Sequence, residues 1–373
     1  MKLTIERSEL LKSLAHVQSV VERRTTIPIL SNVRIEAGED GLGLTATDMD
    51  IAIVETATAK VSQGGTTTAP AHTLYDIVRK LPDGSEIQIS QDGEKGQLHL
   101  QAGRSKFRLA CLPVGDFPSL SAGDLPHKFT IPAADLRSLI DRTRFAISTE
   151  ETRYYLNGIY LHAAETEDGK PALRAVATDG HRLARVDAAL PDGAADMPGI
   201  IIPRKTVGEM RKLIEDTDDE VEVALSDIKI SFAFDHVVLT SKLIDGTFPD
   251  YNRVIPPDND KILELDCKLF AEAVDRVATI STEKSRAVKL AVQPKGLTIS
   301  ATSPENGTAS EELEVSYESD AIEIGFNSRY LLDIAQQIDA NGAQFAMADA
   351  ASPTVVRDLS DPGALYVLMP MRV

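Results

Sequence analysis

The chain has 373 residues, which is enough for two or three domains with cores of their own. Hydrophobic residues make up 43% of it and charged residues 26%, a balance typical of a folded globular protein and not of a disordered one. The formal net charge of −18, taken as a total, argues against a conventional nucleic-acid binder, because such proteins neutralise phosphates with an excess of Lys and Arg.

Nothing in the sequence points to a membrane or to an oxidising compartment. No apolar run approaches the roughly 20 residues that a membrane helix needs, and the opening MKLTIER is charged too early for a secretory signal. The two cysteines, Cys111 and Cys267, lie far apart and outside any metal-ligand spacing. We therefore expect a cytoplasmic protein with two free thiols.

The first elements along the chain alternate between strand and helix patterns. Residues 3–21 predict a short strand and then a helix with Ser8 as its N-cap and an apolar face of Leu10, Leu14, Val17 and Val21. Strands with period-two alternation follow in VRIEA, LGLTATD and IAIVETATA. A second helix precedes the strands EIQIS, QLHLQA and KFRLACL, and its apolar face consists of Leu74, Ile77, Val78 and Leu81.

This order of elements returns twice, and short sequences return with it. The opening KLTIERSELL (2–11) matches KFTIPAADLR (128–137) and ILELDCKLFA (262–271). Further echoes are FAISTEETR (145–153) with ATISTEKSR (278–286), GDFPSL (115–120) with GTFPDY (246–251), and ATD at 46–48 with ATD at 177–179 and SATSPENG at 300–307. Because the echoes keep their order, they predict three homologous domains, which we place at 1–125, 126–255 and 256–373.

Each predicted domain holds two strand-and-helix units, so six are expected in all. Strands outnumber helices, and the turns at Asp92-Gly93 and Asp168-Gly169 favour antiparallel hairpins. The sequence therefore predicts an α+β fold in which two helices per domain pack on antiparallel sheets.

The segment ATDGHRLAR (177–185) has the residue types of an active site. Ser148, Asp179 and His181 could form a hydrolytic triad, but the recurrence of ATD at equivalent positions favours a turn that the aspartate closes. DMD (48–50) and DTDDE (216–220) lack the spacing of a calcium loop, and no two histidines have helical metal-ligand spacing. No phosphate-binding loop, nucleophile elbow or HExxH motif occurs. We predict no catalytic residue, no metal and no cofactor.

The basic residues concentrate on predicted helices, whereas acidic residues concentrate in strands and turns such as 215–223 and 310–320. In the helix expected over 135–147, Arg137, Arg142 and Arg144 lie on or near the side opposite a buried stripe of Leu136, Leu139, Ile140 and Ile147. Solvated helix faces explain any single pair. Equivalent helices facing a common centre would instead line it with positive charge, and an acidic protein could then hold a polyanion.

Two strands far apart in the chain carry opposite charges. GRSKFRLACL (103–112) is basic and SEELEVSYE (310–318) is acidic. The two could pair head to tail between copies of the chain and close a ring if the geometry allows, or each could be buried in its own domain; the residues alone leave both open.

Six segments in order resemble the bacterial DNA polymerase III beta subunit family, the sliding clamps: RRTTIPILSN (23–32), RYYLNGIYL (153–161), ATDGHRLA (177–184), IIIPRKTV (201–207), SKLIDGTFPDYNRVIP (241–256) and YVLMPMRV (366–373). The resemblance covers the whole chain. It implies the DNA clamp fold in a ring-shaped, head-to-tail homodimer, with helices lining the hole. Such a ring encircles duplex DNA, tethers the replicative polymerase, has no catalytic activity and is opened by an ATP-driven clamp loader.

The resemblance also implies functional residues. A pocket for short peptide motifs of DNA polymerases, the clamp loader and repair proteins would comprise Leu156, Thr178, Gly180, His181, Arg182, Leu183, Pro249, Arg253, Val254, Val367, Met369, Pro370, Met371 and Arg372. Residues near DNA would be Arg24, Tyr154, Tyr155, Arg204 and Lys205. The chain departs from related clamps at His72-Thr73, where basic residues are common, and at Glu150, so no contact with DNA is assigned there.

The dimer interface implied by the resemblance sets Arg104, Lys106, Phe107 and Leu109 of one copy against Ile280, Glu305, Glu311 and Glu312 of the other. A clamp-fold scaffold that binds proteins but is never loaded on DNA is the alternative function. A hydrolase centred on Asp179 and His181 is a third hypothesis.

Overall fold

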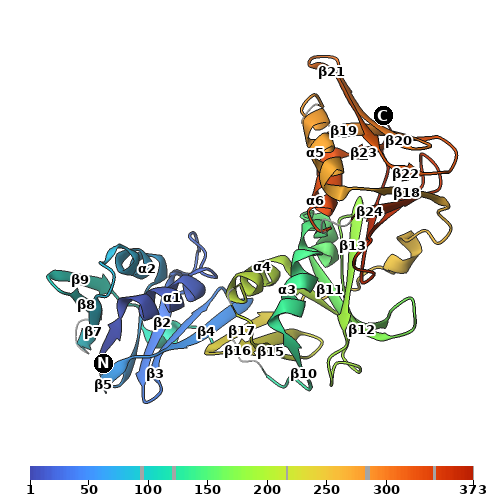
Figure 1. Cartoon of the computed structure of the whole chain (residues 1–373). Helices are drawn as coiled ribbons and strands as arrows, with labels where there is room; N and C mark the ends of the chain where they lie inside the picture. Colours follow the sequence, from blue (N-terminus) through green and yellow to red (C-terminus); the bar gives the residue numbers. More distant parts are fainter. Residues whose placement is uncertain (93–95, 120–122, 216, 282–285, 339–341, 373) are drawn as a thin grey trace. The chain divides into compact units, whose positions relative to one another are not determined.

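The structure is a computed structural model that describes residues 1–92, 96–119, 123–215, 217–281, 286–338 and 342–372 (Figure 1). The described chain forms two compact units, one of Met1–Ala134, Pro191–Pro198 and Lys205–Leu243, the other of Asp135–Leu190, Gly199–Arg204 and Ile244–Val373. The three domain ranges expected from the sequence repeats remain a prediction.

In the described residues, six successive units of strand, helix and three strands follow one another, which confirms the predicted α+β class. The first two are β1 (Lys2–Glu6), α1 (Arg7–Gln18), β2 (Asn32–Gly38), β3 (Gly41–Thr47) and β4 (Ile51–Ala57), then β6 (Gly65–Pro70), α2 (Ala71–Lys80), β7 (Glu86–Asp92), β8 (Gln97–Ala102) and β9 (Ser105–Ala110). The next two are β10 (His127–Pro132), α3 (Ala133–Asp141), β11 (Gly158–Glu165), β12 (Pro171–Thr178) and β13 (Arg182–Ala189), then β14 (Ile200–Pro203), α4 (Arg204–Leu213), β15 (Glu220–Leu225), β16 (Lys229–Phe234) and β17 (Val237–Lys242).

The last two units are β18 (Lys261–Leu265), α5 (Cys267–Ala278), β19 (Ala287–Gln293), β20 (Gly296–Ser303) and β21 (Gly307–Glu314), then β23 (Ile322–Asn327), α6 (Ser328–Ala335), β24 (Ala343–Met347), β25 (Thr354–Asp358) and β26 (Ala364–Leu368). Two short strands, β5 (Lys60–Gln63) and β22 (Ser316–Tyr317), add to sheet edges. The 3-10 helices are η1 (Pro28–Ser31), η2 (Val114–Asp116), η3 (Arg144–Ala146), η4 (Glu151–Leu156) and η5 (Tyr251–Val254).

All the sheets are antiparallel, and two of them join distant parts of the sequence. The first compact unit holds the sheet β5-β1-β7-β8-β9 and the sheet β10-β15-β16-β17-β4-β3-β2-β6. The second holds β14-β11-β12-β13-β26-β25-β24-β18-β22 and β21-β20-β19-β23. The junctions are the pairs β4–β17 and β13–β26, whereas β9 and β21 end their sheets and pair on one side only among the described strands.

The helices cover one face of their strands. In Figure 1, α1 and α2 lie side by side over strands of the first unit, and α5 and α6 lie side by side in the second. Strand residues alternate in burial because successive side chains point to opposite faces: in β1, Leu3 and Ile5 are buried, whereas Lys2 is exposed and Thr4 and Glu6 are half-buried. The predicted stripe of Leu136, Leu139, Ile140 and Ile147 is buried, and so are Leu74, Val78 and Leu81, while Ile77 is half-buried.

Some local predictions were wrong. Glu6, not Ser8, is the N-cap of α1, because its carboxylate accepts from the backbone amide of Ser8. The helix expected over 135–147 ends at Asp141 and is followed by the 3-10 turn η3. The turn at Asp168-Gly169 is present between β11 and β12, with Gly169 at φ 75°; Gly93 of the other expected hairpin turn lies outside the described residues.

Candidate peptide pocket and DNA-facing residues

The turn in ATDGHRLAR joins β12 to β13. Asp179 Oδ1 accepts hydrogen bonds from the backbone amides of His181, at 2.9 Å, and Arg182, at 3.0 Å, and Gly180 has φ 87°. The earlier ATD forms the same turn: Asp48 Oδ1 accepts from the amides of Asp50 and Ile51, both at 2.9 Å. The aspartate therefore closes a repeated turn, as the recurrence predicted.

The third repeat keeps the turn with a different acceptor. Ser303 Oγ accepts from the amides of Glu305, at 3.3 Å, and Asn306, at 3.2 Å. A serine hydroxyl can replace the carboxylate because the turn needs only a side-chain oxygen two and three residues before the amides that donate to it.

The proposed triad is not assembled. Ser148 Oγ accepts from the Glu150 amide, and the His181 ring stacks on Tyr330 with centroids 6.2 Å apart. Asp179 is engaged by backbone amides and by Arg182, 3.2 Å away. Among the described residues, no group of three or more His, Cys, Asp or Glu side chains is placed to hold a metal ion.

Arg182, assigned to the peptide pocket, is a buried side chain that links three elements of the fold. Its side chain is 8% exposed and pairs with Asp333 and Asp179, and Nη2 donates to the carbonyl oxygen of Phe145 at 2.6 Å. The guanidinium carbon lies 4.3 Å from the centroid of the Tyr330 ring. The arginine therefore joins the β12–β13 turn to η3 and α6.

An apolar cluster lies beside this turn and holds several predicted pocket residues. Leu156, Leu183 and Val367 are buried in it together with Val176, Ile201, Phe248, Tyr251, Val355 and Leu365. Its edge is open: Val254 is 46% and Met369 41% exposed, and Pro249 and Arg253 are exposed too. The structure thus brings the apolar members together around a partly exposed edge, where an apolar peptide side chain could dock.

The chain end continues along this cluster. The Met369 amide donates to the carbonyl oxygen of His181 at 2.9 Å, and the Met371 amide donates to that of Gly325, also at 2.9 Å. These two bonds hold the backbone of Met369–Met371 between the β12–β13 turn and β23. Pro370 and Met371 are half-buried, whereas the Arg372 side chain is exposed.

Sequence reasoning missed Arg153. Its Nη2 donates to the carbonyl oxygen of Asp179 at 3.0 Å, and its Nε donates to Glu150 at 2.9 Å. A Cβ at Gly180 would lie 2.5 Å from Arg153 Nη1, so the glycine makes room for the guanidinium group. The spacing of Glu150 and Arg153, three residues apart before the tyrosines, could have signalled this pair.

A polar network behind the cluster was also missed. The Arg174 guanidinium lies 2.7 Å from both Asp187 oxygens, and its Nη1 donates to the Tyr251 hydroxyl at 3.4 Å. His162 Nε2 lies 3.0 Å from the same hydroxyl. Burial lowers the pKa of His162, although a hydrogen bond to the Ala163 carbonyl opposes the shift, and the Arg174 charge adds to it. Tyr251 begins η5, so the network fixes the segment that carries Arg253 and Val254.

The residues assigned to DNA differ in their environments. Arg24 and Arg204 are exposed, and Tyr154 is 53% exposed. Tyr155 packs against the apolar cluster, and its ring meets that of Tyr154 edge-on with centroids 5.8 Å apart. Lys205 instead bonds to acids, with Nζ 2.5 Å from Asp48 Oδ2. Arg142, expected near the basic helix face, is turned inward to Asp358, Asp361 and Tyr366.

Lys205 and Asp48 shift each other's pKa. Burial alone would raise the pKa of Asp48, but the bonds from Lys205 and the turn amides outweigh it and lower the pKa below the ordinary value. Burial likewise opposes the charged form of Lys205, yet the bond to Asp48 raises its pKa. Both groups are therefore charged at neutral pH.

The residues assigned to the dimer interface lie on the end strands β9 and β21 or in the turns before them, except Ile280, which follows α5. On β9, Lys106 is exposed, Phe107 half-buried and Leu109 9% exposed; Arg104, in the turn before it, is exposed. Ile280 is half-buried, while Glu305 and Glu312 are exposed. Glu311 accepts from Arg276 Nε, at 3.0 Å, and Nη2, at 2.6 Å, within the same chain. Its carboxylate is therefore engaged before any second copy arrives.

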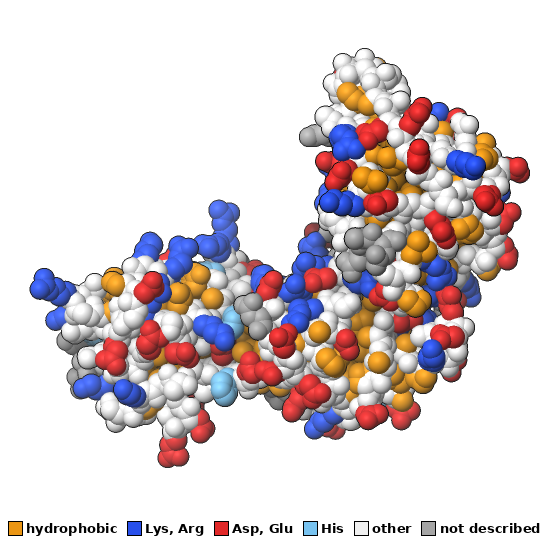
Figure 2. All heavy atoms as spheres, in the orientation of Figure 1, with side chains coloured by type: hydrophobic (Ala, Val, Ile, Leu, Met, Phe, Trp, Pro, Cys, Tyr) orange, Lys and Arg blue, Asp and Glu red, His pale blue; other side chains and the backbone are white. Residues whose placement is uncertain are grey.

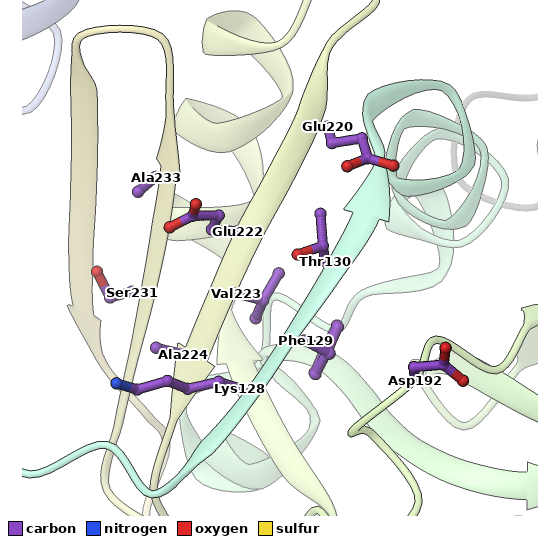
Figure 3. Close-up of a pocket in the computed structure, with 10 residues that line it drawn as sticks. All are labelled: Lys128, Phe129, Thr130, Asp192, Glu220, Glu222, Val223, Ala224, Ser231 and Ala233. Carbon is purple, nitrogen blue, oxygen red and sulfur yellow. The ribbon is translucent and has the colours of Figure 1, made fainter.

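The surface of the first compact unit segregates charge. Figure 2 shows Lys and Arg side chains mostly on the side of α1 and α2, and Asp and Glu mostly along the strands below. On the outer face of β10, β15 and β16, a pocket of about 650 Å³ is lined by Lys128, Thr130, Asp192, Glu220 and Glu222, among others (Figure 3). Three of its charged side chains, Asp192, Glu220 and Glu222, are carboxylates on the strand side of this unit. Among the described helices, none is long and apolar enough to cross a membrane.

The fold is similar to those of solved sliding clamps. A solved beta sliding clamp of Caulobacter crescentus superposes with a TM-score of 0.97 at 56% identity, covering 100% of this chain and 99% of the other. A DnaN sliding clamp of Bartonella birtlesii bound to griselimycin gives a TM-score of 0.96 at 50% identity, with full coverage of both chains. The fold is thus that of a sliding clamp.

The sequence places the chain in a family. Models of the N-terminal, central and C-terminal domains of the DNA polymerase III beta subunit match residues 1–121, 130–250 and 252–372. The beta sliding clamps of Caulobacter vibrioides and Escherichia coli are 57% and 39% identical over the full length of both chains. The chain belongs to the DNA polymerase III beta subunit family, the bacterial sliding clamps.

Proposed function

We propose that two copies of this chain form a ring that encircles duplex DNA and tethers the replicative polymerase and other replication and repair proteins. The observation that carries the proposal is the repeated junction. In β4–β17 the strands of two successive parts of the chain pair, and in β13–β26 the next two parts pair in the same way. β21 and β9 are the corresponding strands left at sheet ends, so pairing them between copies completes the series.

The internal repeat also supplies the register of this proposed pairing. Ile53 pairs with Leu239 across β4–β17, and Ala184 pairs with Tyr366 across β13–β26. Ala309 is the equivalent position on β21, because Ala301 pairs with it as Ala46 pairs with Ile53 and Ala177 with Ala184. Phe107 is the equivalent position on β9, because Leu100 pairs with it as Phe232 pairs with Leu239. Phe107 of one copy should therefore face Ala309 of the other, with Lys106 opposite Ser310 and diagonal to Glu312.

This register favours an interface with an apolar centre. Phe107 and Ile280 are half-buried in the single chain, so burying the remainder of each would contribute less than the ~1.5–3 kcal/mol of a fully exposed side chain, whereas Leu109 is already buried. Exposed ion pairs contribute ~0–1 kcal/mol each, so Arg104, Lys106, Glu305 and Glu312 would act more on register than on affinity.

Contact with DNA would come from Arg24, Arg204 and Tyr154, with Tyr155 packed behind. Lys205, whose ammonium group bonds to Asp48, would support this surface. Contacts to phosphates carry no sequence information, which suits a ring that must slide. Concentrating basic side chains on the helix side, as in Figure 2, lets a chain of net charge −18 hold a polyanion.

Partner motifs would dock on the cluster around Leu183 and Val367, with Met369 and Val254 at its rim. Methionine adapts to several side chains, which suits a site shared by different partners. The binding of griselimycin by a related clamp supports a ligand site in this fold. Asp179 and His181 would shape the turn beside this site and perform no chemistry, and the protein would act in the cytoplasm without a cofactor.

Retention on circular DNA tests the ring. Labelled protein is loaded on nicked circles with a clamp loader and ATP, isolated by gel filtration, and the circle is then cut once. Protein that stays on circles and leaves linear DNA is held by topology. Equal retention on both forms would indicate surface binding, and retention on neither would favour the unloaded scaffold.

A further inference from the structure

The segment after α1 presents two adjacent arginines. Arg23 and Arg24 are exposed, and in the part of the chain that the structure describes neither side chain makes a hydrogen bond or an ion pair. Val20 and Val21, just before them, are 0% and 4% exposed. The segment Val20–Arg24 is thus anchored where it leaves the helix and free where the arginines begin.

Lys205 holds this segment to a neighbouring turn. Its Nζ donates to the carbonyl oxygen of Val20 at 3.2 Å and to Glu22 Oε1 at 3.4 Å. The same ammonium group bonds to Asp48 Oδ2 at 2.5 Å. Asp48 uses its other oxygen to close its own turn, so the lysine is fixed to a rigid support.

His72 holds the segment a second time. Its Nε2 donates to the carbonyl oxygen of Val21 at 3.0 Å, and its Nδ1 lies 2.7 Å from the Oε1 of Gln18, the last residue of α1. Val21 lies three residues beyond the end of α1, where its carbonyl has no intrahelical partner, and the His72 donor satisfies it. Two side chains from distant parts of the sequence thus fix the exit of α1.

We propose that Lys205 and His72 are positioning residues for DNA binding, which act by holding Val20–Arg24 so that Arg23 and Arg24 meet the phosphates. The proposal rests on the proposed function, since it assumes that this surface faces DNA. The competing possibility is that Lys205 itself contacts a phosphate, and that its ion pair with Asp48 forms only in the absence of DNA.

The variant Asp48→Asn separates the two. Asn keeps the oxygen that accepts from the turn amides but replaces Oδ2 with an amide group that cannot accept from Lys205. Asp50→Asn is the matched control, because Asp50 is exposed, lies in the same turn and pairs with Lys242 instead. Any general effect of removing one negative charge appears in both variants.

Limited trypsin digestion of the full-length protein measures the segment directly. Cleavage after Arg23 and Arg24 should accelerate about threefold or more in Asp48→Asn, Lys205→Met and His72→Ala, because local opening becomes easier. Asp50→Asn should digest like the wild type. Unchanged cleavage in all three variants would overturn the proposal whatever the protein binds.

Binding of a fluorescein-labelled duplex, measured by anisotropy over a salt series, tests the consequence for DNA. We expect Asp48→Asn to bind more weakly than Asp50→Asn; tighter binding would mean that Lys205 contacts phosphate. In an Arg23→Ala/Arg24→Ala background, Lys205→Met should weaken duplex binding by less than about 1.5-fold, because the residues that it positions are already gone. A drop of ~0.9 in the salt slope there would reveal a direct contact and overturn the proposal.

The two arms separate this proposal from the proposed function. If the wild-type protein neither binds duplex nor is retained on circles, the DNA function fails, and the role of Lys205 and His72 in DNA binding fails with it. The digestion result then still decides whether they hold the segment.

Discussion

The guanidinium group of Arg182 lies over the ring of Tyr330, 4.3 Å from its centroid, and pairs with Asp333 of the same helix. A motif that looks catalytic in the sequence thus contains an arginine that packs one part of the second compact unit against another. Its neighbour Leu183 belongs to the apolar cluster, so Arg182 and the candidate pocket share one strand.

Arg182→Leu should lower the free energy of unfolding by about 3 kcal/mol, because it leaves Asp179 without its cation, and Asp333 with only Arg329 at 3.9 Å, in a largely buried site. Urea unfolding measures the change. Arg253→Leu is the control: that arginine is 84% exposed and pairs with Asp250, so its loss should cost less than about 1 kcal/mol. Equal losses of unfolding free energy in the two variants would show that the contacts of Arg182 with η3 and α6 do not stabilise the fold.

Gly180→Ala should destabilise the protein by about 1–3 kcal/mol, since a side chain at φ 87° is strained and its Cβ would displace Arg153. Gly169→Ala has a similar φ, 75°, but its Cβ would meet no atom within 4 Å. The excess cost at Gly180 measures the displacement of Arg153. We also expect Gly180→Ala, but not Gly169→Ala, to bind a polymerase-motif peptide more weakly, as measured by calorimetry. Equal affinities in the two variants would show that the position of Arg153 does not affect the pocket.

The His162 network should make stability depend on pH. Burial lowers the pKa of this histidine in the folded state, so the unfolded chain binds the proton more readily. Stability is therefore lost as the pH falls below about 6.5, the ordinary value for histidine. Urea unfolding between neutral and mildly acidic pH should show a larger loss for the wild type than for His162→Gln. Parallel curves would show that His162 does not contribute.

The repeat-derived register can be tested by disulfide cross-linking. In a background of Cys111→Ser and Cys267→Ser, Lys106→Cys with Ser310→Cys should form cross-linked dimers on a non-reducing gel. Directly opposite residues lie ~4.5–5.5 Å apart, within reach of a disulfide. The diagonal pair Lys106→Cys with Glu312→Cys, ~7–8 Å apart, should cross-link poorly. A preference for the diagonal pair would show a register shifted by two residues.

Much of the architecture could be predicted because it rests on local patterns. The two-residue and helical periods gave the six strand-and-helix units and the buried stripe of Leu136, Leu139 and Ile140, since one face of each element must leave water. The return of ATD predicted a shared turn because an aspartate closes it with residues two and three positions away.

Partners distant in the sequence could not be predicted this way. Arg142 looked like part of a basic surface, yet the fold brings Asp358 and Asp361 to it and turns it inward. Arg182 was assigned to a pocket, but α6 supplies Asp333 and Tyr330 and buries it. Ser8 failed as a cap because Glu6 offered an oxygen at the same helix start.

The sequence by itself therefore determined which residues form strands and helices, how often the pattern repeats and which family the chain resembles. Only the tertiary structure decided which charges are free and which are engaged. Lys205 shows the reason: its ammonium group meets Val20, Glu22 and Asp48 only after strands and helices from two repeats have packed together. The energy of a charge depends on what surrounds it in space, and no local pattern records that.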